Sequence, residues 1–429
     1  MSARLTINFF TPLPPQQTSI ADHSARLLPA LCAIADVTVW TYQELWDPLP
    51  IPGLQVHRFD PTTPPQKFHD ATVNFYNLGN NNQFHEPIFK VSRKVPGVVI
   101  LHDPNMGYFF GHLARSDEGR RFFLDFVTRQ YGREGLDAAV ALFSGKLRIE
   151  DFMMRYPMTE AALTGALAVV VHNRPLQAQL ERDLPMPSYC VPLSHLIRQP
   201  ERTRRTSAPP YRLVTFGYLG ANRRLENIAD ALATFPQRDL FRWDIYGTMQ
   251  VRRWPVFLKT LRLRHMIATH DFVDEHVLDD ALAKADLAIN LRNPTMGEAS
   301  SSQLRIWEHG LASLASRVGW YADQPPDTLF FVEPEHEVES IQQYLTDFLY
   351  DREPFLVAGE RGRKHCVDVH NTEQYARAIV GIAEAAPLLH RRKGAAEYAS
   401  AAARAAHTLW DPRTREWTES VSASIEMLV

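Results

Sequence analysis

Short apolar runs alternate with amphipathic stretches along most of the chain. In the first half, several of these runs are continuous rather than alternating, which is typical of strands buried on both faces of a sheet. The predicted strands are Leu5–Phe10, Val37–Trp40, Val56–Phe59, Thr72–Leu78, Val98–His102, Leu167–His172 and Tyr189–Pro192. The predicted helices between them span 20–35, 108–130, 132–145 and 174–184. This alternation predicts a parallel, doubly wound sheet.

The alternation stops at "LIRQPERTRRTSAPP" (196–210), which is polar and basic and has no apolar periodicity, so it is the predicted linker. Beyond it the alternation restarts. The predicted strands are Arg212–Gly217, Arg242–Gly247, Ile267–Val273, Asp286–Leu291 and Thr328–Val332. The predicted helices span 223–234, 252–264, 276–285, 301–314 and 337–352, and the Ala-rich end of the chain is helical with breaks near Pro387 and Pro412.

These patterns predict an α/β protein with two Rossmann-like, doubly wound domains that face a central cleft. The predicted N-terminal domain spans 1–195 and the C-terminal domain 211–386. The helices of 387–429 are expected to pack back toward the N-terminal domain.

Composition narrows the function. A formal net charge of -3 gives no global basic field, so no nucleic-acid partner is expected. Three scattered cysteines exclude a disulfide framework and a structural zinc site, and they fit a reducing cytoplasm. Neither a secretory signal nor an apolar run of ~20 residues is found. The expected location is therefore cytoplasmic, with any membrane contact peripheral, at the inner face.

Ligands of such sheets bind at the carboxyl ends of the strands. In "INLRNPTMGEASSSQLRIWEHG", Glu298 lies in a turn and Ser300, Ser301 and Ser302 open a helix. The free N–H groups and positive dipole end of a helix hold phosphate well, and serine adds hydroxyl donors. The alternative, that Glu298 and the serines merely cap a helix, stays open.

Two further strand ends carry candidate chemistry. In "RLVTFGYLGANRRLE", Gly217 allows close approach of a ligand, and Arg223 could place a fixed positive charge on a diphosphate. In "VVILHDP", His102 and Asp103 end a buried strand and are candidates for substrate contact. Solvated arginines and a histidine that caps the sheet edge are the respective alternatives. GxGxxG and GxxxxGK[ST] phosphate loops are absent from the sequence.

Together these stretches resemble the retaining glycosyltransferases of GT-B fold, in the family-four group of sugar-nucleotide enzymes. The resemblance covers the whole chain. It rests on "TPLPPQQTSIADHS" (11–24), "LHD" (101–103), "VHN" (171–173), "FGYLGANRRLE" (216–226) and "LRNPTMGEASSSQLR" (291–305).

The resemblance implies a role for each matched position. Glu298 would contact the donor sugar, with Gly297 beside it, and the N–H groups of Ser300–Ser302 would hold the diphosphate. Arg223 takes the place of the family's phosphate-binding Lys, and Gly217 would let the phosphates approach. His102 takes the place of the family's sugar-contacting His. The donor is a nucleotide diphosphate-sugar, and neither a cofactor nor a metal is implied. The sequence also contains no DxD motif. Front-side displacement with retention is the family's mechanism.

Three positions depart from the family pattern. Arg305 replaces the Glu that holds the ribose, and Glu308 is the candidate substitute. Tyr218 replaces a cation, for which Arg224 or Arg292 could compensate. Thr18-Ser19 replaces the Gly of the first loop.

The acceptor is expected to be a saccharide or a lipid-linked saccharide, as in surface polysaccharide synthesis. The aromatic and basic stretch 105–160 should form helices on the acceptor side, and its pattern fits both core packing and contact with a membrane surface. Two other functions stay open, because fold does not fix function. They are a sugar-nucleotide epimerase and a weakly catalytic protein that binds sugar nucleotides or glycans.

Overall fold

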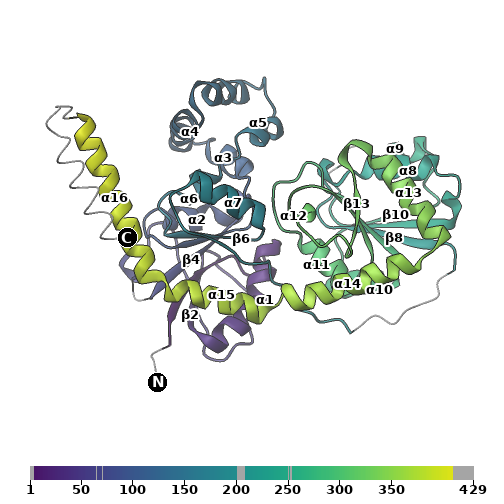
Figure 1. Cartoon of the computed structure of the whole chain (residues 1–429), viewed down its shortest axis with the longest axis horizontal. Helices are drawn as coiled ribbons and strands as arrows, with labels where there is room; N and C mark the ends of the chain where they lie inside the picture. The colour runs from purple at the N-terminus through teal and green to yellow at the C-terminus, as the bar shows by residue number, and fades with distance from the viewer. Residues whose placement is uncertain are drawn as a thin grey trace. The chain divides into compact units, whose positions relative to one another are not determined.

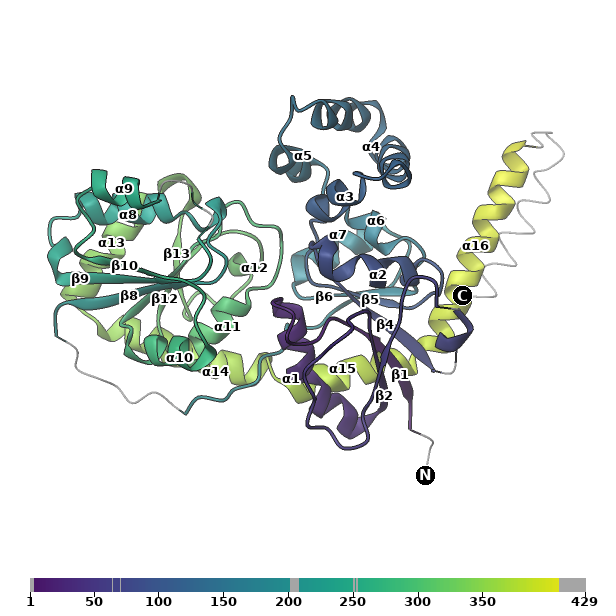
Figure 2. The same ribbon diagram turned by 180° about the vertical axis from the view of Figure 1, so that it is seen from behind.

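The computed structural model describes residues 4–63, 65–69, 71–200, 208–249, 251 and 254–408. The chain divides into two compact units, called here unit 1 (Met1–Val191 with Tyr375–Val429) and unit 2 (Pro192–Gln374). Each unit is a parallel sheet covered by helices on both faces, as the alternation of strands and helices predicts (Figures 1 and 2).

Unit 1 contains a seven-stranded parallel sheet with the order β3-β2-β1-β4-β5-β6-β7. The strands are β1 (Thr6–Phe10), β2 (Asp36–Thr41), β3 (Gln55–Arg58), β4 (Val73–Leu78), β5 (Val98–Leu101), β6 (Ala168–Val171) and β7 (Ser188–Cys190). All residues of β4, β5 and β6 are buried. The seven predicted strands all form, because a continuous apolar run is stable only where both faces of the sheet are covered.

Helices cover both faces of this sheet. The helices of unit 1 are α1 (Ser19–Ile34), α2 (Asn82–Ser92), α3 (Gly107–Leu113), α4 (Asp117–Phe143), α5 (Ile149–Arg155), α6 (Thr159–Leu163), α7 (Arg174–Asp183), α15 (Thr372–Glu384) and α16 (Ala386–Thr408). Of these, α4 and α5 lie on α3 and away from the sheet (Figures 1 and 2). One core joins α1 and α15 to β1, and another joins α2 and α3 to β4. The sequence did not predict α2, whose interior contains Pro87. It did predict the helix break near 131, where Gly132 of α4 has a non-helical conformation.

Unit 2 contains a six-stranded parallel sheet with the order β10-β9-β8-β11-β12-β13. The strands are β8 (Tyr211–Phe216), β9 (Phe241–Tyr246), β10 (Ile267–His270), β11 (Leu287–Asn290), β12 (Ser313–Ser316) and β13 (Phe330–Val332). The helices are α8 (Leu225–Thr234), α9 (Trp254–Thr260), α10 (Glu275–Lys284), α11 (Ser301–Glu308), α12 (Gly319–Ala322), α13 (Glu337–Tyr350) and α14 (Glu353–Val369). Helices α8 and α13 lie on one face, and α10, α11 and α14 on the other (Figures 1 and 2).

The sequence missed β12, α12 and α14 of unit 2, and α15 of unit 1. The predicted helix 301–314 ended too late, because α11 stops at Glu308 and Gly310 turns the chain with φ 58°. The following "SLAS" is buried throughout, although only two of its side chains are apolar. Short strands in the middle of a covered sheet need little apolar signal, because neighbouring strands satisfy their main chain.

The unit boundaries differ from the predicted ones. Residues 375–386 were expected in the C-terminal domain, but Ala376, Ile379 and Ala383 of α15 lie in the core of unit 1. Leu389 of α16 is buried in the same core. Of the predicted linker, 196–200 belongs to unit 2, whereas 201–207 lies outside the described residues, as does the predicted break at Pro412.

Candidate functional site

Arg223 lies at the centre of the predicted phosphate site of unit 2. Its guanidinium donates from Nη1 to Oδ1 of Asn290 at the end of β11 (2.6 Å). It donates from Nη2 to Oγ of Ser302 in α11 (3.3 Å) and to the carbonyl of Phe216 at the end of β8 (3.4 Å). The main-chain N–H of Asn293 also donates to the carbonyl of Asn222, which ties together the loops after β8 and β11. The structure thus places Arg223 and Ser302 together, as the sequence predicts.

Gly217 makes room for Arg223. Its φ of 114° lies in the region that favours glycine, and a Cβ at this position would lie 2.8 Å from Nη2 of Arg223. The sequence suggested that Gly217 lets a phosphate approach the main chain. In the structure, the guanidinium of Arg223 occupies the space that a side chain would take.

The guanidinium of Arg223 is buried among neutral hydrogen-bond acceptors. The side chain is 3% exposed, and all its hydrogen-bond acceptors are neutral. None of the described carboxylates forms an ion pair with it, whereas Arg224 and Arg292 each have one. Burial, and then the positive charge of Arg292, lowers the pKa of Arg223 to about 9. The negative charge of Glu298 opposes this lowering only in part. A buried cation without an ion-pair partner is costly, and a bound anion would supply one.

The three serines have different roles. Ser300 is the N-cap of α11, and its buried hydroxyl accepts from the amide of Gln303 (3.1 Å) and from the hydroxyl of Tyr321 (2.7 Å). Ser301 is exposed at the first helical position, and Ser302 accepts from Arg223. Helix capping by Ser300 is therefore observed. The amides that open α11 begin beside the buried guanidinium, and helix N-termini favour anions.

Glu298 closes the loop that precedes α11. One carboxylate oxygen pairs with the guanidinium of Arg292, and the other accepts from the amide of Met296 (2.9 Å) and the hydroxyl of Thr295 (3.4 Å). Gly297, with φ 82°, turns the chain between them. Arg292, Gly297 and Glu298 are all partly exposed, so the loop that the sequence assigned to the donor sugar reaches the surface of unit 2. We call Arg223, Arg292, Glu298 and Ser300–Ser302 the arginine edge.

Arg224 turns away from this site. Its Nε donates to Oε2 of Glu337 (2.7 Å), which also accepts from Nδ2 of Asn227 (2.6 Å). Glu337 is buried. The predicted compensation by Arg224 for the missing cation does not agree with this placement, because the guanidinium is used to neutralise Glu337.

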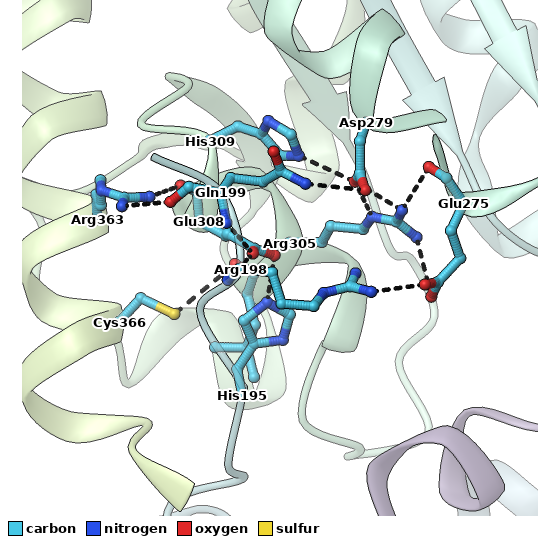
Figure 3. A network of polar contacts seen from close by, with 11 residues as sticks. His195, Arg198, Gln199, Glu275, Asp279, Arg305, Glu308, His309, Arg363 and Cys366 are labelled. Atoms are coloured by element: carbon cyan, nitrogen blue, oxygen red, sulfur yellow. Dashed lines mark hydrogen bonds and ion pairs between the residues drawn. The ribbon is translucent and has the colours of Figure 1, made fainter. Parts of the chain in front are cut away.

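Glu308 is not available to a ribose. Its carboxylate is fully buried and accepts from His195 (2.7 Å) and from the main-chain amides of Arg198 (2.6 Å) and Gln199 (3.0 Å), as Figure 3 shows. Burial opposes the ionisation of Glu308, but these hydrogen bonds outweigh it and lower the pKa to about 2. Arg363 ties the same segment to α14 by donating to the carbonyls of Glu308 and Gln199. Glu308 therefore fastens residues 195–199 to α11, which corrects the prediction.

Arg305 is held by acidic residues of α10. Its guanidinium donates to Oδ1 of Asp279 (2.7 Å) and to the carbonyl of Glu275 (3.0 Å) (Figure 3). The carboxylate of Asp279 also accepts from His309 (3.1 Å). The departure at Arg305 thus belongs to the same internal network as Glu308.

The candidate residue of unit 1 lies just after β5. His102 is buried, with Nε2 3.0 Å from Oδ1 of Asn77 and Nδ1 3.2 Å from Nε2 of His172. The ring of His23, from α1, lies 5.5 Å from that of His102. We call His23, His85, His102 and His172 the histidine edge. Three of them come from the stretches 11–24, 101–103 and 171–173 that carried the resemblance, and the structure brings these together.

Three members of the histidine edge, His85, His102 and His172, are uncharged at neutral pH. Burial lowers the pKa of His85 and of His172 to about 4. Burial, followed by repulsion from His172 and His23, holds the pKa of His102 well below its ordinary value. Thr18, where the family has a Gly, is the N-cap of α1 and accepts from the amide of Ile20 (3.4 Å).

The helices of 105–160 are packed against the fold through their aromatic residues. Phe109, Phe110, Phe123 and Phe152 are all buried in one core. No helix in the described part of the chain is both long enough and apolar enough to cross a membrane. Core packing of these aromatics is thus observed, and contact of this region with a membrane surface stays a prediction.

The sequence did not reveal the partners of the candidate residues. Asn290 hydrogen-bonds Arg223, and Asn77 hydrogen-bonds His102. Glu337 accepts from Arg224. Asn77 and Asn290 are each the polar residue near the carboxyl end of a buried strand. A polar side chain at the end of such a strand was the available signal. Glu337 lies over a hundred positions from Arg224, and no local pattern reports that contact.

The chain matches no protein-family model and no curated protein. Solved structures are similar to it over both units. Sucrose-phosphate synthase from Thermosynechococcus elongatus has a TM-score of 0.61 at 14% identity, covering 88% of this chain and 98% of its own. Anabaena HepE in complex with UDP and glucose has a TM-score of 0.59 at 11% identity, covering 88% and 99%. WaaG, a glycosyltransferase involved in lipopolysaccharide biosynthesis, has a TM-score of 0.55 at 14% identity, covering 87% and 100%. This likeness confirms the predicted two-domain α/β fold of the GT-B type.

Proposed function

We propose that this protein is a glycosyltransferase that moves a sugar from a nucleoside diphosphate-sugar to a saccharide or lipid-linked saccharide, with retention of the anomeric configuration. The observation that carries the proposal is the arginine edge, where the buried, unneutralised Arg223 lies beside the N-terminus of α11. A diphosphate would supply the missing negative charge and accept from the first amides of the helix.

The reaction needs a site that stabilises a departing diphosphate. The acceptor oxygen forms a bond to the anomeric carbon while the bond from that carbon to the diphosphate oxygen breaks, and the departing oxygen takes the acceptor's proton. Negative charge therefore develops on the diphosphate, where Arg223 and the amides of Ser301 and Ser302 stabilise it. These groups perform that role without a metal, which is part of the proposal.

The remaining roles follow from position. Glu298 and Gly297 would contact the donor sugar after the carboxylate exchanges some of its contacts within the loop. His102 would contact the sugar from unit 1. The similar structures support these assignments in kind, because one of them contains UDP and glucose and another is named as a glycosyltransferase of lipopolysaccharide biosynthesis. A role in surface polysaccharide synthesis, and contact of α4 and α5 with a membrane, are part of the same proposal.

Product analysis tests the proposal directly. Incubation with UDP-, GDP-, ADP- and TDP-sugars, each with and without saccharide and lipid-linked acceptors, should give a new glycoside only when an acceptor is present. The anomeric proton coupling of the product should match that of the donor. A ligand at 100 times its dissociation constant should also stabilise the fold by about 2.7 kcal/mol in a thermal shift.

Each other function gives a different result. An epimerase converts the donor sugar without an acceptor, and a binding protein gives the thermal shift without turnover. The absence of any shift and of any product would contradict the proposal. Glu298→Gln, which keeps the shape of the side chain, should slow transfer by roughly 100-fold, as expected for the loss of one contact to the reacting sugar. Full activity in this variant would refute the role of Glu298.

A further inference from the structure

Two buried imidazoles of the histidine edge lie in contact with each other. They belong to a chain of polar groups that ends in a main-chain carbonyl on either side. Nδ1 of His172 lies 2.9 Å from the carbonyl of Val191, and its Nε2 lies 3.2 Å from Nδ1 of His102. Nε2 of His102 lies 3.0 Å from Oδ1 of Asn77, whose Nδ2 donates to the carbonyl of Phe10 (3.1 Å).

The two carbonyls fix the direction of the outer hydrogen bonds, because a carbonyl oxygen only accepts. His172 must donate from Nδ1 to Val191, and Asn77 must donate its amide N–H to Phe10. Oδ1 of Asn77 then faces His102 and needs a donor there. A neutral imidazole carries one proton, so both protons are used at these outer contacts. The central contact between His102 and His172 would then join two lone pairs.

The two neutral rings have one proton too few for these contacts, and no rearrangement of the protons removes this shortage. Moving the proton of His102 to Nδ1 fills the central contact but leaves Nε2 and Oδ1 of Asn77 as two facing acceptors. Rotating the amide of Asn77 places its oxygen against the carbonyl of Phe10, at the distance where the amide nitrogen now donates. Every arrangement with two neutral rings therefore leaves one contact between acceptors, and one additional proton completes all four hydrogen bonds.

The surroundings allow one added proton and oppose a second. The titratable groups around the pair are His23 on α1, His85 on α2, Asp103 after β5 and Tyr375 on α15. His85 faces the carbonyl of Asn77 (3.1 Å), and Oδ2 of Asp103 accepts from the amide of Asn80 (2.8 Å). Both rings of the pair are buried, so two charged rings in contact would repel strongly, whereas one charge can be shared.

We propose that His102 and His172 bind one proton in common, between Nδ1 of His102 and Nε2 of His172, and that His172 positions His102 through it. The proton comes from solvent, forms one N–H bond and leaves the pair with one positive charge. It fixes the Nε2–H of His102 on Asn77, so the ring has one orientation. Because burial disfavours the charge, uptake occurs below the ordinary histidine pKa of 6.5. Only the link to sugar contact rests on the proposed function.

Nitrogen-15 NMR of the histidine rings in the full-length protein tests this proposal. As the pH is lowered from about 8, the resonances of His102 and His172 should shift together and report one proton for the pair, with an apparent pKa below about 6.5. Two rings that keep the shifts of neutral imidazoles down to acid unfolding would overturn the proposal. So would two independent protonations.

The variant His172→Phe separates hydrogen bonding from simple charge repulsion. If His172 accepts the shared proton, its loss lowers the pKa of His102, because the charged ring loses its acceptor. If His172 acts only as a like charge, its loss raises that pKa. A rise would therefore refute the proposal.

Two other variants complete the test. His85→Phe removes a buried imidazole that lies outside the chain of hydrogen bonds, so the pair should still take up one proton. Asn77→Asp places a carboxylate against Nε2 of His102 and should raise the apparent pKa of the pair while both rings still shift together. If only the resonances of His102 moved, the shared proton would be refuted, so this variant also decides the matter if His172→Phe does not fold. An unchanged pKa in Asn77→Asp would count against the proposal. These readouts do not require sugar transfer, so they stand even if the enzyme assay fails.

Discussion

The two units differ in the charge of the candidate residues at the carboxyl ends of their sheets, although their architecture is the same. In each unit the candidate residues follow strands of a parallel sheet, at the carboxyl ends where α/β sheets bind ligands. In the histidine edge of unit 1, the imidazoles of His85, His102 and His172 are buried and neutral at pH 7. The arginine edge of unit 2 holds Arg223, a buried cation that has no ion-pair partner among the described carboxylates, beside the start of α11. Each edge therefore favours a different kind of ligand group: the arginine edge favours an anion, and the neutral imidazoles favour uncharged hydrogen-bonding groups.

The adjacent residues Arg223 and Arg224 give the largest expected effect and a matched control. Arg223→Met should reduce kcat by roughly 10²–10³-fold, because it removes the positive charge that stabilises the departing diphosphate. It should also abolish the thermal shift produced by the donor. Steady-state rates and thermal shifts with the same donor measure both effects.

Arg224→Met should have the reverse profile. It leaves the buried Glu337 without its cation and should lower the free energy of unfolding by about 2 kcal/mol, measured by urea denaturation. The donor-induced thermal shift and the rate per folded molecule should persist. If both variants lost donor binding equally, the distinction between a ligand cation and a structural cation at this edge would be wrong.

The next prediction concerns the stability of unit 2 and the buried carboxylate of Glu308, which does not belong to the arginine edge. Glu308→Gln should destabilise unit 2 by about 3 kcal/mol, because an amide cannot accept all three hydrogen bonds from His195, Arg198 and Gln199. Segment-resolved hydrogen exchange should show the loss in α11 and in 195–199. Arg361→Gln, which removes an exposed ion pair on α14, is the control and should change stability by less than about 0.5 kcal/mol.

The pH dependence of this contribution has a definite sign. The folded pKa of Glu308 is about 2, below the unfolded value of 4.5, so its contribution is present above pH 4.5 and is lost as the pH falls toward 2. The gap corresponds to roughly 3 kcal/mol. Unit 2 should therefore keep this contact at every pH at which the histidines of unit 1 begin to titrate.

The sequence predicted the layers of the fold better than the partners of the site. Buried strands such as β4 and β5 are continuous apolar runs, so their position follows from local pattern. Gly217, Arg223 and Ser302 follow strands or open a helix, and they were predicted as site residues for that reason. The role of Glu308 could not be predicted, because its partners lie more than a hundred residues earlier. Two of the three bind it through main-chain amides, which carry no sequence signal. Arg224 was misassigned for the same reason, since its acidic partner belongs to α13.

The smallest effect concerns the stability of unit 1 in mild acid. His85 and His172 protonate near pH 4 in the folded protein and near 6.5 when unfolded, so the unfolded chain binds more protons between these values. Stability should therefore fall as the pH drops below 6.5, by about 1 kcal/mol for each histidine at about pH 5.5. Hydrogen exchange of peptides from β4 and β5 should accelerate there before that of peptides from β8 and β9. His85→Phe should remove one histidine's share of this pH dependence, whereas replacing the exposed Glu44 by Gln should not. Burial also lowers the pKa of His309 and His365 in unit 2, so the expected difference between the units is one of size. Equal acceleration in both units at about pH 5.5 would show that the two edges do not differ in charge as the structure indicates.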